Sequence, residues 1–104
     1  MAPTVVSVVY PKGAKFDMDY YLNHHMPLVR EKWESYGLKS WKVAQYTNPE
    51  SPYSVIAWLE FESAEHWAKA AASLEGKDTF ADIPHFTDGK ADVLVGDVKK
   101  SDSW

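Results

Sequence analysis

The residues best suited to chemistry are concentrated in the segment 16–28, which contains two tyrosines, two histidines and a proline. Tyr21 precedes His25 by four residues, so the two side chains share one face of a helix. A histidine with an ordinary pKa of about 6.5 exchanges protons near neutral pH, and a phenol beside it donates a hydrogen bond. We therefore predict His25 and Tyr21 as catalytic residues. The alternative is structural, with His25 binding backbone groups freed by a helix break and Tyr21 filling the core.

A second segment with polar and aromatic residues, 82–86, contains His85 and Phe86. We expect it to lie over the mouth of a pocket, with His85 as a further candidate catalytic residue, and a surface loop is the alternative. Aromatic side chains commonly line apolar ligand pockets. The candidates for a ligand-binding role are Tyr20, Trp41, Trp58 and Phe86. A place in the core or in a subunit interface is the alternative for the tyrosine and the tryptophans.

The composition excludes several classes of function. The 104 residues suit one domain, which we expect to span residues 1–104. A net charge of −4 and the lack of a Lys/Arg cluster argue against nucleic-acid binding. The chain has no cysteine, which fits a reducing compartment, so we expect a cytoplasmic protein. No signal peptide is readable, and no apolar run approaches the ~20 residues that cross a bilayer, so we expect no membrane association.

The sequence offers no arrangement typical of a metal or nucleotide site. His24 and His25 are adjacent, so their side chains diverge on a helix and cannot hold one ion together. Neither a His-x-His nor a His-x-x-x-His spacing occurs, and the chain has no glycine-rich phosphate loop. We therefore expect neither a metal nor a cofactor.

The hydrophobic pattern predicts six elements in the order βαββαβ. Apolar residues with helical spacing, from Leu22 to Tyr36, predict a first helix that begins after Asp17 and breaks near Pro27. We expect strands at 4–10, 38–48, 53–61 and 91–98, of which the middle two form an antiparallel hairpin. We also expect a second helix at 63–75 ended by Gly76, and irregular structure at 77–91 with a short helical turn around Phe80-Ala81. This order is that of a ferredoxin-like α+β fold, with a four-stranded antiparallel sheet and two helices on one face.

The strand at 53–61 has apolar residues on both of its faces. Ile56 and Trp58 cannot share a face with Val55 and Leu59, because side chains alternate along a strand. The two helices cover only one side of the sheet, so the second side needs another cover. A second copy of the sheet is the simplest one, and we expect a homodimer.

The first helix and three later segments resemble the EthD family. The resemblance rests on Phe16, Asp17, Tyr20-Tyr21, His25 and Pro27-Leu28, together with Gly37-Leu38, Leu59-Glu60-Phe61 and Asp82-Ile83-Pro84. It implies the dimeric α/β-barrel superfamily, in which two ferredoxin-like protomers pack sheet to sheet. The namesake accompanies a haem monooxygenase system that degrades a fuel ether. Relatives include polyketide cyclases, cofactor-independent monooxygenases, muconolactone isomerases and haem-degrading enzymes.

These observations point to a pocket rather than to one reaction. We expect a cofactor-independent enzyme of the cyclase, dehydratase, isomerase or decarboxylase type, or an accessory to an oxidative degradation pathway. Its ligand would be a small, apolar, oxygenated compound. The first alternative is a non-catalytic carrier that binds a hydrophobic ligand. The second is a haem-binding barrel with His25 or His85 as the axial ligand.

Overall fold

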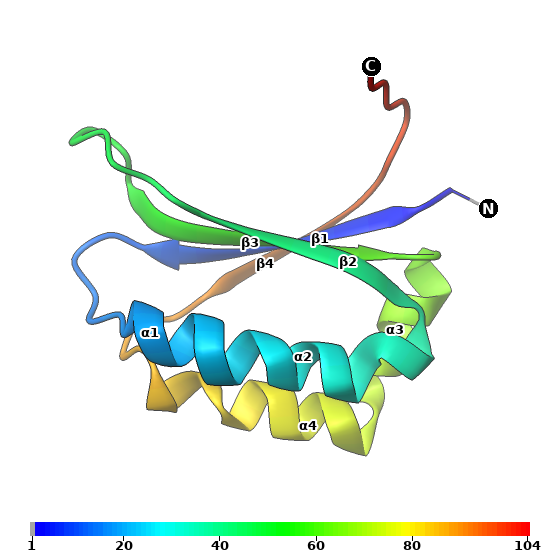
Figure 1. Cartoon of the computed structure of the whole chain (residues 1–104), viewed down its shortest axis with the longest axis horizontal. Coiled ribbons are helices and arrows are strands. Elements are labelled where there is room, and N and C mark those ends of the chain that lie inside the picture. The colour runs from blue at the N-terminus through cyan, green and yellow to red at the C-terminus, as the bar shows by residue number, and fades with distance from the viewer. Residues whose placement is uncertain (1) are drawn as a thin grey trace.

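A four-stranded antiparallel sheet forms one layer of the computed structural model, which describes residues 2–104, and helices form the other layer (Figure 1). The strands are ordered β2-β3-β1-β4, so β1 and β3 lie in the centre of the sheet. The predicted ferredoxin-like α+β fold is therefore confirmed. The strands are β1 (Thr4–Pro11), β2 (Leu38–Gln45), β3 (Tyr53–Phe61) and β4 (Asp92–Asp97), and the helices are α1 (Met18–Tyr20), α2 (Met26–Trp33), α3 (Ala64–Ala72) and α4 (Leu74–Ala81).

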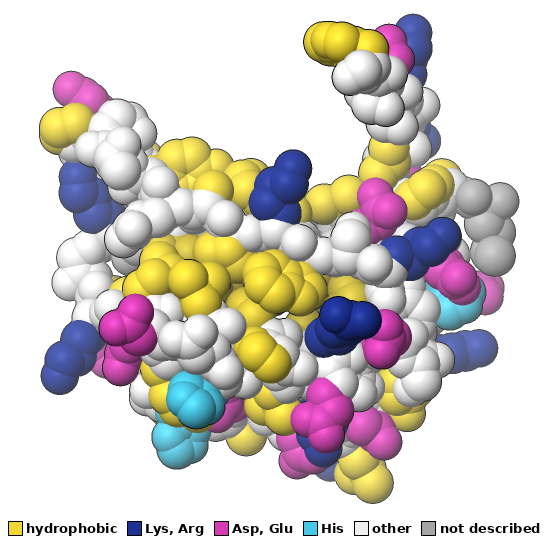
Figure 2. Space-filling view, viewed as in Figure 1, with side chains coloured by type: hydrophobic (Ala, Val, Ile, Leu, Met, Phe, Trp, Pro, Cys, Tyr) yellow, Lys and Arg dark blue, Asp and Glu magenta, His cyan; other side chains and the backbone are white. Residues whose placement is uncertain are grey.

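The core lies between the sheet and the helices. Side chains alternate along β1 and β3, so every second residue of each strand faces the helix layer. Val6 pairs with Leu59 and Val8 pairs with Ala57, so the core residues of the two strands lie opposite each other. The largest fully buried side chains are Trp33, Tyr10, Tyr21, Phe61 and Met26. Figure 2 shows acidic and basic side chains over the outer side of the helix layer, with hydrophobic side chains visible between this layer and the sheet.

The first helical region is interrupted where the sequence predicts a break. The backbone N–H of Tyr20 donates to the Asp17 carboxylate at 3.1 Å, which confirms Asp17 as the N-cap. A π-helical turn (Tyr21–His25) follows, and α2 then begins with Pro27 in its first turn. Proline has no N–H to continue the hydrogen-bond ladder, and it lies just after the turn in which that ladder already departs from α-helical spacing.

The π-helical turn changes which residues face the core. The predicted apolar stripe began with Leu22, but Leu22 is 40% exposed, whereas Tyr21 is 1% exposed. The backbone N–H of Met26 donates to the Tyr21 carbonyl, a bond that spans five residues. Residues five apart are therefore close in this turn, and Tyr21 takes the place next to Met26 that the α-helical spacing assigned to Leu22.

The second helical region corrects two further predictions. Gly76 does not end a helix, because α3 stops at Ala72 and the Ser73 hydroxyl caps a new helix, α4, by accepting from the Gly76 N–H at 3.0 Å. Within the segment 77–91, the short helical turn expected around Phe80-Ala81 is the end of a longer helix. The helix α4 continues to Ala81, and a 3-10 turn (Ile83–His85) follows it. Serine is a strong N-cap residue, which explains how two helices can adjoin without a loop.

Within residues 2–104, no helix covers the second face of the sheet (Figure 1). Ser7 of β1 pairs with Trp58 of β3 and with Leu94 of β4, so these three side chains share that face. Ile56 lies on the same face, opposite Val9. This set of residues, called the open face below, is apolar at its centre. None of the helices within residues 2–104 has the length and the apolar character to span a bilayer.

The close approach of α3 to α4 predicts the effect of a methyl group at Gly76. A Cβ there would overlap the carbonyl oxygen of Ala70 and lie 2.7 Å from that of Ala71. Alanine ordinarily stabilises a helix by about 1 kcal/mol relative to glycine. For Gly76→Ala we expect the opposite sign, a loss of about 1–3 kcal/mol in the free energy of unfolding, because backbone atoms must move.

Urea denaturation of the variants measures this effect. Lys77→Ala is the matched control, because Lys77 is exposed on the same helix, α4. Its unfolding free energy should stay within about 0.5 kcal/mol of the parent protein. A Gly76→Ala variant as stable as the parent would show that the two helices do not pack this closely.

Candidate functional site

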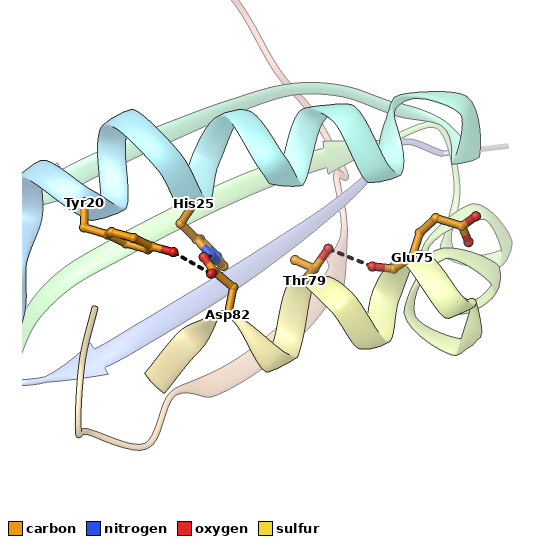
Figure 3. Close-up of polar contacts among 5 residues, drawn as sticks. All are labelled: Tyr20, His25, Glu75, Thr79 and Asp82. Atoms are coloured by element: carbon orange, nitrogen blue, oxygen red, sulfur yellow. Dashed lines mark hydrogen bonds and ion pairs between the residues drawn. The ribbon is translucent and has the colours of Figure 1, made fainter. Parts of the chain in front are cut away.

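Asp82 joins the two predicted site residues of the first helical region. The Tyr20 hydroxyl donates to Asp82 Oδ1 at 2.7 Å, and His25 Nδ1 lies 2.9 Å from Asp82 Oδ2 (Figure 3). Asp82 directly follows α4, and the other two residues come from the helix that lies beside it. One carboxylate therefore binds a phenol and an imidazole at the same time.

The π-helical turn explains why both side chains reach Asp82. Tyr20 and His25 are five residues apart, a spacing that places side chains on different sides of an α-helix. In a π-helical turn, residues five apart are nearly aligned. The turn between Tyr20 and His25 thus directs both of them towards the end of α4. Such turns occur frequently at functional sites.

The charge of Asp82 determines the protonation of the imidazole. Partial burial pushes the Asp82 pKa upward, but the hydrogen bonds from Tyr20 and His25 outweigh this effect and the pKa lies below its usual value. Asp82 is therefore a carboxylate at neutral pH and can only accept hydrogen bonds. It follows that His25 Nδ1 carries the proton, and Nε2 of the neutral ring is the atom left to accept one.

His25 itself is kept neutral by its surroundings. The side chain is almost fully buried, and burial lowers the pKa of His25, while Asp82 acts in the opposite direction by stabilising the charged form. An imidazole that is neutral at physiological pH and has a carboxylate behind it can accept a proton. The pairing with Asp82 then stabilises the imidazolium that forms.

A small cavity adjoins this pair between the sheet and the helices. Its volume is about 30 Å³, which is space for a water molecule. The lining side chains include Tyr10, Tyr21, His25, Val29, Thr79 and Phe80. Phe80 lines the cavity and is partly exposed, so it lies on the side of the cavity towards solvent. A ligand larger than water requires the lining side chains to move.

Aromatic rings pack around His25. The Tyr21 ring stacks on it with centroids 5.5 Å apart and an interplanar angle of 14°, and the Phe86 ring lies 4.6 Å away. Burial raises the pKa values of Tyr10 and Tyr21, so both phenols keep their protons at physiological pH. The environment of the imidazole is thus apolar, with neutral hydroxyl groups.

The structure brings together some of the predicted site residues and separates others. Tyr21, His25 and Phe86 lie in contact, and Tyr20 is linked to them through Asp82. His85 is exposed, and its ring stacks on the Tyr20 ring at a centroid distance of 6.0 Å, outside the cavity.

Two of the predicted ligand-binding residues lie elsewhere. Trp58 lies on the open face, and Trp41 lies on the edge strand β2, where it is exposed. Neither tryptophan lines the cavity beside His25, and the other two predicted ligand-binding residues, Tyr20 and Phe86, lie next to His25 but outside the lining. Strand alternation fixes the face of a residue but not what covers that face, so the sequence could not place the two tryptophans.

Asp82 is the site residue that the sequence analysis did not single out. It lies within the segment 82–86, which was expected near the pocket mouth, but it was not assigned a role there. The signal in the sequence was the position of Asp82, an acidic residue three positions before the candidate His85. In the part of the chain that the structure describes, no group of three or more His, Cys, Asp or Glu side chains is arranged to hold a metal ion.

Comparisons with known proteins agree with this architecture. Residues 13–90 match the family model described as the EthD domain. An uncharacterised 11.0 kDa protein of Rhodococcus erythropolis, from the thcB-thcC intergenic region, is 33% identical over 96 residues, which cover 88% of this chain and 91% of the relative.

Two solved structures share the fold. An EthD-like protein from Ralstonia eutropha has a TM-score of 0.82 and 25% sequence identity, with 99% of each chain covered. A dimeric ferredoxin-like protein of unknown function from Jannaschia sp. CCS1 has a TM-score of 0.68 and 14% identity, covering 92% of this chain and 99% of that one. The second likeness is one of fold alone.

The contact between His25 and Asp82 predicts the titration of the imidazole. NMR titration of the ring protons should give a His25 pKa below the ordinary value of about 6.5. Asp82→Asn should lower this pKa further, because the carboxylate favours the charged imidazole. The matched control is Asp78→Asn on the outer side of α4, where Asp78 pairs with Lys32 at 3.4 Å. It should leave the His25 pKa unchanged.

The lowered pKa of His25 makes the free energy of unfolding depend on pH. The unfolded chain takes up a proton at His25 near pH ~6.5, whereas the folded chain does so only at lower pH, so the unfolding free energy falls as pH decreases through this window. His25→Gln should remove this part of the pH dependence in urea denaturation. A His25 pKa unaffected by Asp82→Asn would contradict the assigned pairing, and a His25 pKa above that of a free histidine would contradict the dominant effect of burial.

Proposed function

The chain belongs to the EthD domain family, and we propose that it is a small-molecule pocket protein that acts as a cofactor-independent enzyme on a small, apolar, oxygenated compound. The observation that carries the proposal is the pairing of the buried His25, which lines a cavity, with the partly buried Asp82. Titratable groups with perturbed pKa values cluster at functional sites.

In this proposal His25 is the group that moves the proton. Its Nε2 accepts a proton from the ligand, and Asp82 stabilises the imidazolium through Nδ1. Tyr21 stacks on the imidazole and orients it, and Tyr20 holds Asp82 in place through its hydroxyl. Removal of a proton next to a carbonyl, or its return elsewhere on the molecule, is the step that isomerisation, dehydration and cyclisation share.

A non-catalytic carrier is the second candidate, and the apolar lining of the cavity favours it. A carrier would bind the same class of compound without converting it. A haem at His25 would require a far larger opening than a small ligand does, because the cavity of about 30 Å³ is much smaller than a porphyrin. The pairing of Nδ1 with Asp82 leaves Nε2 as the atom that could bind an axial iron. His85, the other candidate axial ligand, lies on the surface.

We further propose that two copies pair through their open faces, as in a dimeric α/β barrel. Trp58, Ile56 and Leu94 give this face an apolar centre that no helix within residues 2–104 covers. The dimeric assembly of the Jannaschia protein of the same fold supports the proposal. Pairing would bury these side chains, and burial of apolar area stabilises association.

Variants of two neighbouring histidines test the enzyme proposal. Small phenols, enolisable ketones and lactones are incubated with the protein, and NMR follows both binding and conversion. For a compound that is converted, His25→Gln should lower kcat/KM by about 100-fold or more, the usual contribution of a general base. His24→Gln is the matched control, because His24 is exposed on the same helix and should change kcat/KM by less than about twofold.

The outcomes separate the two candidate functions. Binding without conversion of any compound would support the carrier. An unchanged affinity and an unchanged turnover in His25→Gln would contradict a role of His25 in either function.

Leu94→Glu tests the pairing of the open faces. Leu94 is 61% exposed in the single chain, so the change should leave the fold intact but bury a charge in the dimer interface. We expect light scattering after gel filtration to show a dimer for the parent protein and a monomer for this variant. Leu74→Glu is the control, because Leu74 is 74% exposed on α4 in the helix layer. A monomeric parent protein would overturn the proposed assembly.

A further inference from the structure

The cavity beside His25 has a distinctive distribution of charge. Within residues 2–104, no lysine or arginine contributes to its lining. Two basic residues of α2 lie nearby in sequence, but Arg30 pairs with Glu34 and Lys32 pairs with Asp78, both with N–O distances of 3.4 Å. The charged group closest to the imidazole is the Asp82 carboxylate. A second anion entering the cavity would meet no cation.

The lining of the cavity also contains polar groups that can accept hydrogen bonds but cannot donate them. The Thr79 hydroxyl is buried, and it donates its proton to the Glu75 carbonyl oxygen at 2.9 Å (Figure 3). Its oxygen is thus left with lone pairs only. His25 donates through Nδ1 to Asp82, so its Nε2 is likewise an acceptor. Two polar groups of the lining therefore accept hydrogen bonds and have no proton to offer a ligand.

The phenols of Tyr10 and Tyr21 complete the polar lining. Both are buried and protonated, and the Tyr21 hydroxyl interacts with that of Tyr10 as its donor, so the Tyr10 hydroxyl is the one left to donate a hydrogen bond to a ligand oxygen. A ligand oxygen that carries its own hydrogen suits this lining best, because it can donate to an acceptor and accept from a phenol. An ionised carboxylate has no hydrogen to donate and would leave the acceptors unmatched.

We propose that this cavity selects neutral hydrogen-bond donors of the phenol or enol class and rejects carboxylates. The inference rests on the small-molecule function proposed above and names the class of compound for that same site. Flat, neutral rings also suit the aromatic side chains that surround His25. Burying an unpaired anion costs several kcal/mol, whereas a neutral hydroxyl is matched by the groups already present.

Three small probes of similar shape test the proposal at neutral pH: phenol, anisole and benzoate. Phenol donates a hydrogen bond, anisole cannot donate one, and benzoate is an anion. Their dissociation constants are measured by NMR titration of the His25 ring signals. We use both the parent protein and Phe80→Ala, because Phe80 is a partly exposed residue of the lining and truncation of its ring enlarges the cavity for the probes.

Phenol should bind most tightly to both proteins. Anisole should bind about 10-fold more weakly, the effect of one missing hydrogen bond to a buried acceptor, and benzoate about 100-fold more weakly or not detectably. Thr79→Val should reduce the affinity for phenol but not that for anisole, because valine keeps the shape of threonine and removes the acceptor oxygen.

The possible failures are distinguishable. Benzoate binding as tightly as phenol would overturn the selection against anions and leave the pocket function standing. Anisole binding as tightly as phenol would overturn the requirement for a donor. If none of the probes shifts the His25 signals in either protein, both this inference and the proposed pocket function are overturned.

Discussion

The hydrogen bond between His25 and Asp82 is the interaction on which the candidate site depends. It links the first helical region to the end of α4 and so joins two parts of the helix layer that are 57 residues apart in the sequence. It also defines the chemistry of the imidazole, because an ionised carboxylate at Nδ1 leaves Nε2 as the accepting atom. Without this contact, the ring would be a neutral side chain in an apolar core, with no preferred tautomer.

The backbone provides the geometry that this contact requires. A regular helix would direct Tyr20 and His25 to different sides and would bury Leu22 in place of Tyr21. The π-helical turn aligns Tyr20 with His25 and places the Tyr21 ring on the imidazole. Pro27 is compatible with this arrangement because it lies just after the turn in which the hydrogen-bond ladder already departs from α-helical spacing. The irregular segment of the helix and the candidate site are therefore one structural feature.

The two faces of the sheet have separate roles in this interpretation. The face towards the helices holds the core and the cavity beside His25, so one chain contains the complete candidate site. The open face carries Trp58 and Leu94 and is available for pairing with a second copy. Because the strands alternate, a residue on one face contributes little to the other. Assembly and ligand binding can thus be altered independently.

Local patterns in the sequence correctly predicted the order of the elements, the hairpin of β2 and β3, and the Asp17 N-cap. Each of these features depends on residues that are close together in the chain. The same patterns also indicated the break near Pro27. The choice of Asp82 as the partner of His25, and the placement of Trp58 away from the cavity, were decided by tertiary packing. Local spacing also assigned Leu22, rather than Tyr21, to the core. The physical reason is that a side chain's partner depends on the approach of distant segments, and that a single π-helical turn reassigns the faces of a helix.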